Sequence, residues 1–148
     1  MDLSKDIIGH KLNPLPFTVE RGKLREFCLA IGETNPIYTD PEAARSEGFR
    51  DTPVPPTFQT VFVFWGYPEI WNDMKSLGID VERLLHMKEQ YHYHHPVYPG
   101  DEITPEGSVE DVKTGKMDMV TFHTVYKNQE GQTCIEARMS IVLRPPGK

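Results

Sequence analysis

The sequence has two cysteines, no long apolar run and no excess of basic charge. Cys28 and Cys134 lie far apart, in neither a zinc-binding nor a redox spacing, so we expect two buried thiols in a reducing compartment. The longest nearly unbroken apolar run, Val61–Tyr67, is far too short to cross a membrane. The 16 basic and 22 acidic side chains give a net charge of −6 without a basic stripe. This charge balance argues against nucleic acid or an anionic membrane surface as a partner.

Motifs for bound cofactors are also missing. The glycines form neither GxGxxG nor GK[ST], the loops that hold phosphates. His92 and His94 share one face of an expected strand, but no third zinc ligand follows from the spacing. The first ten residues carry charges where a signal peptide would need its apolar core. We therefore expect a cytoplasmic protein without a metal or a cofactor.

What the sequence has is enough apolar surface for one domain spanning residues 1–148. Apolar residues make up 38% and charged residues 26%, which argues against disorder. A chain of 148 residues buries about two thirds of its unfolded surface, enough to fold without a disulfide or a metal. The patterning changes near His86, from helical to alternating.

Helices are predicted in the first half. Apolar residues recur at helical spacing over Glu20–Ile31, at Leu24, Phe27, Cys28 and Ile31. Thr18 is the expected N-cap of this helix, and Gly32 suits its end. Asp40-Pro41 opens a second, short helix that Gly48 closes.

A third helix is predicted over Thr57–Tyr67, after the extended loop Arg50–Pro56. It is apolar on nearly every side, which is typical of a buried helix. We expect four of its side chains to face a sheet: Phe58, Val61, Phe62 and Trp65. Pro68–Leu85 is expected to hold one or two further short helices, with Asp80 as a cap.

Strands are predicted in the second half, where apolar and polar residues alternate. The expected ranges are His86–Tyr98, Glu102–Lys113, Met117–Lys127 and Gln132–Arg144, with a short first strand in Leu15–Val19. This order predicts an α+β fold in which an antiparallel sheet of five or six strands wraps around the helix near Thr57–Tyr67.

One connection is unusual, the string GETNPIYTD at residues 32–40. Asn35-Pro36 forces a turn that can present Glu33, Asn35 and Tyr38 to one cavity. On these residues alone, an ordinary link between two helices is the favoured interpretation.

The string resembles the GDxNPxH signature of the MaoC-like, (R)-specific enoyl-thioester hydratases and dehydratases, which have the hot-dog fold. LHMKEQYHYHHPVYPGD at residues 85–101 and the tail to IVLR at residues 141–144 extend the similarity. They resemble the dehydratase-like domain of fungal type I fatty-acid synthases and the A and C subunits of mycobacterial hydroxyacyl-thioester dehydratases. The resemblance implies a hot-dog domain acting on 3-hydroxyacyl or 2-enoyl thioesters.

The resemblance also assigns site residues. The family's catalytic aspartate and histidine correspond to Glu33 and Tyr38, so both catalytic positions differ. A longer side chain displaces the carboxylate, and a phenol with a pKa near 10 exchanges protons poorly at neutral pH. Pro56 aligns with the residue whose backbone N–H would polarise the thioester, and proline has no N–H.

Four residues are expected to bind substrate within this frame. Asn35 keeps its place in the motif, and His95 belongs to the strand that carries the resemblance. The N–H groups of Thr57 and Phe58 are expected to supply positive potential at the start of the helix.

Three functions remain open, and the differences at Glu33 and Tyr38 favour the first. The chain is a substrate-binding subunit whose partner supplies Asp and His, a self-sufficient hydratase with Glu33 as base, or a hot-dog thioesterase or acyl-CoA-binding module. The expected ligand is an acyl-CoA or acyl-carrier-protein thioester. By analogy with the family, the chain is expected to form a homodimer, or a heterodimer with a catalytically complete subunit.

Overall fold

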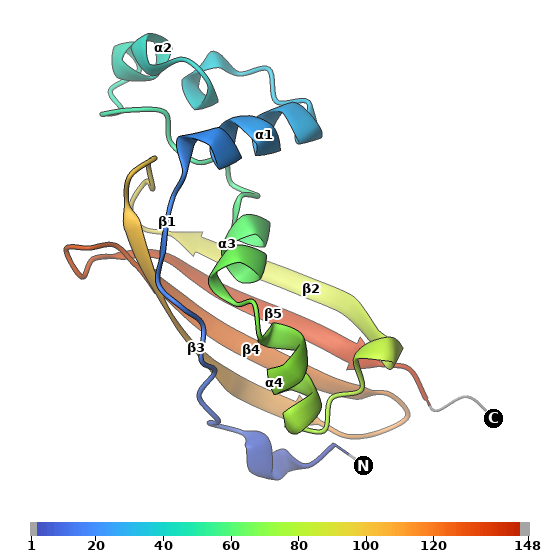
Figure 1. The fold of residues 1–148 in the computed structure, drawn as a ribbon. Helices are drawn as coiled ribbons and strands as arrows, with labels where there is room; N and C mark the ends of the chain where they lie inside the picture. Colours follow the sequence, from blue (N-terminus) through green and yellow to red (C-terminus); the bar gives the residue numbers. More distant parts are fainter. Residues whose placement is uncertain (1–2, 146–148) are drawn as a thin grey trace.

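The computed structural model describes residues 3–145 and contains one curved antiparallel sheet (Figure 1). Its strand order is β1-β3-β4-β5-β2. The strands are β1 (Phe17–Thr18), β2 (Leu84–Tyr93), β3 (Glu102–Lys113), β4 (Asp118–Lys127) and β5 (Thr133–Leu143). The predicted α+β architecture, five strands around a helix, is therefore confirmed.

The helices form two groups (Figure 1). α3 (Gln59–Gly66) and α4 (Ile70–Ser76) lie against the concave face of the sheet, whereas α1 (Arg21–Ile31) and α2 (Pro41–Ser46) lie beyond one end of it. Residues 3–145 also contain three short 3-10 helices: η1 (Lys5–Ile7), η2 (Pro36–Tyr38) and η3 (Val81–Arg83). Asp40 caps α2 and Asp80 caps η3, as the sequence predicts.

Phe62 of α3 joins the helix to the sheet. It is only 1% exposed. Its ring centre lies 5.1 Å from that of Phe17, 5.5 Å from Phe58 and 5.3 Å from Tyr126. Aromatic rings at these separations pack favourably beyond the area that they bury. The expected inward orientation of Phe58, Val61 and Phe62 is confirmed, since all three are buried.

Trp65 is a correction to the predicted helix, because 47% of its surface is exposed. α3 is shorter than Thr57–Tyr67, and at its end the backbone of Gly66 lies directly against the Phe17 ring. Trp65 instead lies under the ammonium of Lys23 of α1, which is 5.2 Å from the ring centre. A cation over an indole face is itself a favourable contact.

Three smaller expectations also need correction. Ile31 is half exposed, because α1 contacts the rest of the core mainly through Leu24 and Cys28. Thr18 lies in β1, so that Glu20 is the N-cap and makes no side-chain capping bond. β2 ends at Tyr93 and not at Tyr98.

β2 forms one edge of the sheet. Within the described chain it pairs with β5 alone, and nearly all of its side chains are exposed or half-buried. A bulge falls at Met87, between His86 and Lys88. No helix in residues 3–145 is long and apolar enough to span a bilayer.

Candidate functional site

The motif loop lies between α1 and α2, where two of its side chains fold back on the backbone. Gly32 ends α1 in the left-handed region at φ 68°. Glu33 Oε1 accepts a hydrogen bond of 2.8 Å from the Asn35 N–H, and Asn35 Oδ1 accepts one of 3.1 Å from the Ile37 N–H. Glu33 and Asn35 therefore hold the turn, and Tyr38 follows it half-buried.

A cavity of about 500 Å³ opens beside this loop, and we name it the Glu33 cavity. Glu33, Cys28 and Tyr38 line it together with Arg21 and Arg25 of α1. Burial, followed by the nearby Glu33 charge, raises the pKa of the Tyr38 phenol and of the Cys28 thiol above their usual values. Both groups are therefore protonated at neutral pH.

Tyr38 also lines a second cavity of about 240 Å³, which we name the His95 cavity. His95, Gln59 and Tyr93 contribute to its wall as well. His95 Nδ1 donates to the Thr133 carbonyl at 2.9 Å, and in a neutral ring this leaves the lone pair on Nε2. The structure thus brings Tyr38 together with Glu33 on one side and with His95 on the other.

The start of α3 forms part of the same wall. The Pro56 carbonyl accepts a hydrogen bond of 2.7 Å from the Tyr93 hydroxyl. Phe58 is buried, packs edge-on against the Phe27 ring, and its N–H donates to the Pro55 carbonyl at 2.9 Å. The Phe58 N–H is thus engaged in the turn and is not available to a ligand, while Thr57 is exposed.

Gln59 is a site residue that the sequence analysis missed. Its side chain is fully buried, and neither Nε2 nor Oε1 makes a hydrogen bond within the described chain. Burial raises the pKa of the neighbouring Tyr93 phenol, and the nearby Gln59 side chain, although outside hydrogen-bond geometry, opposes part of that increase. The signal in the sequence is a lone amide in the apolar run TFQTVFVFWG at residues 57–66.

The histidines form no metal site. No group of three His, Cys, Asp or Glu side chains in residues 3–145 is arranged to bind an ion. His123 Nε2 instead contacts Glu136 Oε1 at 2.8 Å, and Arg138 reaches the same carboxylate at 3.0 Å. The hydrogen bond from His123, followed by that from Arg138, lowers the pKa of Glu136.

Comparison with known proteins identifies related sequences over nearly the whole chain. The family model described as "FAS1-like, dehydratase domain region" matches residues 6–137. A UPF0336 protein of Streptomyces avermitilis is 34% identical over 146 residues, covering 97% of each chain. A UPF0336 protein of Thermobifida fusca is 30% identical over 146 residues, covering 97% of this chain and 95% of its own.

Solved structures share the fold at lower identity. The truncated HadBC (3R-hydroxyacyl-ACP dehydratase) complex of Mycobacterium tuberculosis matches with a TM-score of 0.80 and 23% identity, over 94% of this chain and 99% of its own. The ChsH1–ChsH2 complex of the same organism matches with a TM-score of 0.74 and 20% identity, over 94% of this chain and 86% of its own. An (R)-hydratase of A. caviae matches with a TM-score of 0.71 and 21% identity, over 93% of this chain and 96% of its own.

Proposed function

Since this chain belongs to the family of FAS1-like dehydratase-domain regions, with the hot-dog fold of the MaoC-like dehydratases, we propose that it is the substrate-binding subunit of an acyl-thioester dehydratase or hydratase. It binds a 3-hydroxyacyl or 2-enoyl thioester of CoA or of acyl carrier protein. A partner chain with an intact Asp and His supplies the acid–base chemistry. The reaction takes place in the cytoplasm.

One observation carries the proposal: the loop forms the turn that the motif predicts, while the residues at both expected catalytic positions differ from the family's. Asn35 caps the turn, and Tyr38 lines both cavities. The Glu33 carboxylate is engaged with the Asn35 N–H, and the Tyr38 phenol has a pKa above its usual value. Such a loop frames a substrate, but it lacks the aspartate and histidine pair that exchanges protons in the family.

The architecture supports a partner as well. β2 is an open edge with exposed apolar side chains, and a second hot-dog domain can extend the sheet there. Two of the structural neighbours, HadBC and ChsH1–ChsH2, are complexes of two named subunits. We propose the same arrangement here, with a homodimer when the chain is expressed alone.

Hydration of crotonyl-CoA tests the proposal directly. We expect the isolated chain to be at least about 10³-fold slower than a complete hydratase, because the family's acid–base pair and the backbone N–H at Pro56 are both missing. The same assay with a candidate partner is expected to restore turnover. The double variant Glu33→Asp with Tyr38→His is expected to gain activity, whereas the exposed control Glu42→Asp is not.

A second candidate, a self-sufficient hydratase, is favoured by His95 and Tyr38 sharing one cavity. In that case Glu33 acts as base and a nearby histidine as acid. Robust hydration by the unmodified chain, abolished by Glu33→Gln, establishes this function and overturns the first.

A further inference from the structure

Gln59 is unusual among the buried side chains of this protein. Its exposed fraction is 0%, and within residues 3–145 both of its polar side-chain atoms lack hydrogen-bond partners. Burial of an unpaired amide is unfavourable, and native structures contain few such groups. The fold therefore keeps a polar group where an apolar one of the same shape would stabilise it.

The position of Gln59 indicates what the amide is for. It lines the His95 cavity beside Tyr38 and Pro56, which is where the sequence analysis places the thioester. Neither Pro56 nor Phe58 offers a free backbone N–H at this point, and Thr57 does not line the cavity. Pro56 has none, and the Phe58 N–H donates to the Pro55 carbonyl. The Gln59 carboxamide is an unused donor in the same wall.

We propose that Gln59 Nε2 donates a hydrogen bond to the carbonyl oxygen of the acyl thioester bound in the His95 cavity. The inference rests on the proposed thioester-binding function and names the residue that recognises the thioester group. A side-chain amide can take the place of a backbone donor in stabilising such an oxygen. Because both polar atoms of Gln59 are fully buried in the free chain, the side chain has to turn toward the cavity to reach the ligand oxygen.

The test compares two ligands that differ in one carbonyl group. Butyryl-CoA carries the thioester, whereas S-butyl-CoA has a methylene in place of the carbonyl. We expect Gln59→Met, which preserves the size of the side chain, to weaken butyryl-CoA binding about 10-fold in calorimetric titration. Binding of S-butyl-CoA is expected to change less than about 2-fold, within the scatter of small contact changes. Gln132→Met in the exposed β4–β5 turn is the matched control and is expected to change neither affinity.

Thermal unfolding of the free chain gives a second readout. Gln59→Met removes two unpaired polar atoms, so its Tm is expected to rise by about 3–6 °C. If the amide instead stabilised the fold, Gln59→Met would lower the Tm. A decrease of several degrees would therefore overturn the assignment even if ligand binding weakened.

The outcomes separate this inference from the proposed function. If the unmodified chain binds neither ligand, the thioester-binding function itself fails, and the role of Gln59 fails with it. If the unmodified chain binds both ligands equally, or if Gln59→Met retains full affinity for butyryl-CoA, the function stands and only the assignment of Gln59 is overturned.

Discussion

At the residue scale, the fold depends most on the side chain that joins α3 to the sheet. Phe62 is almost fully buried and contacts the rings of Phe17, Phe58 and Tyr126. Truncation leaves a cavity that three aromatic neighbours cannot fill. We expect Phe62→Ala to lower the free energy of unfolding by about 3–5 kcal/mol, measured by urea denaturation.

Trp65 provides the matched control on the same helix. It is as apolar as Phe62 but half exposed, and its main partner is Lys23. We expect Trp65→Ala to cost less than about 1.5 kcal/mol, since it loses a surface cation–π contact and little buried area. If Phe62→Ala and Trp65→Ala lowered the free energy of unfolding equally, the orientation of α3 described above would be contradicted.

Single residues also show where sequence reasoning reaches its limit. Asn35 and Asp40 were predicted as turn and cap residues because their bonds are local, and both make those bonds. Gln59 was missed because its lack of a partner depends on loops that are distant in sequence. The occupied N–H of Phe58 likewise follows from the turn that the chain adopts at Pro55.

At the element scale, strands were predictable and helix orientation was not. Glu102–Lys113 was predicted to the residue, since alternation and the preceding Pro-Gly-Asp turn are signals within the strand itself. The inward face of α3 was predicted only in part. An apolar residue identifies a face that is able to be buried. Trp65 and Ile31 nevertheless remain about half exposed, and Trp65 is covered on one side by Lys23 of α1.

Tyr67 tests how the elements are tied together. Its hydroxyl donates to the Asp73 carboxylate of α4 and accepts from the Asn13 N–H at 3.3 Å, which links the N-terminal segment, α3 and α4. Burial, and next the bond to Asp73, raises the pKa of Tyr67 to about 12 from its ordinary value of 10.0. The folded state therefore favours the protonated phenol.

The sign of the pH dependence follows from that shift. Stability from Tyr67 is fully present below pH 10 and is lost as the pH rises through about 12, by up to about 2–3 kcal/mol. We expect Tyr67→Phe to cost about 1 kcal/mol at pH 7 and to flatten this alkaline loss, measured by urea denaturation across pH. Asp73→Asn keeps a hydrogen-bond acceptor without the charge. Its alkaline loss of stability is expected to lie between that of the unmodified chain and that of Tyr67→Phe. An alkaline slope unchanged in Tyr67→Phe would contradict the assignment.

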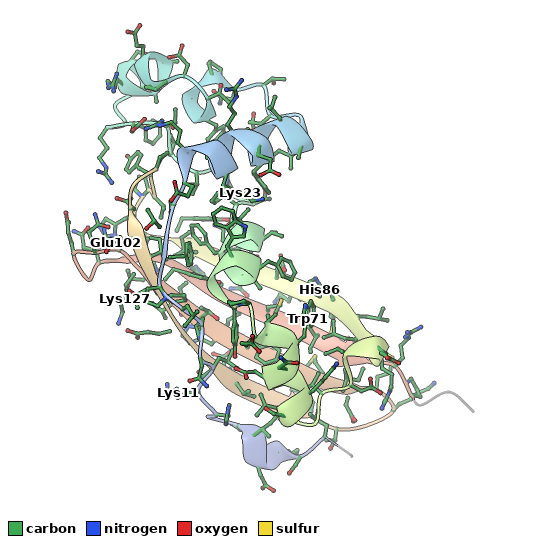
Figure 2. All side chains as sticks on the ribbon, in the orientation of Figure 1. Lys11, Lys23, Trp71, His86, Glu102 and Lys127 are labelled. Atoms are coloured by element: carbon green, nitrogen blue, oxygen red, sulfur yellow. The ribbon has the colours of Figure 1, made fainter. Side chains whose placement is uncertain are left out.

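At the scale of the whole molecule, β2 is an edge strand with exposed apolar side chains. Leu85, Met87 and Tyr93 on this strand are 45%, 60% and 53% exposed. Beside them lies a groove of about 460 Å³, to which α4 contributes Trp71 and β2 contributes His86 (Figure 2). A long unpaired strand with apolar neighbours is a template for pairing with another chain.

We therefore expect the chain to sediment as a dimer at micromolar concentration, with β2 of one copy paired to β2 of the other. Met87→Lys places a charge on that edge and is expected to shift the species toward monomer, because an unpaired buried charge is costly. Met117→Lys is the control, since Met117 is a comparably exposed methionine (51%) in the β3–β4 turn and away from the edge. A wild-type monomer, or equal dissociation by the two variants, would show that β2 is not the interface. Such a result would also remove the structural argument for a catalytic partner at this edge, while the thioester-binding measurements on Gln59 would stand independently.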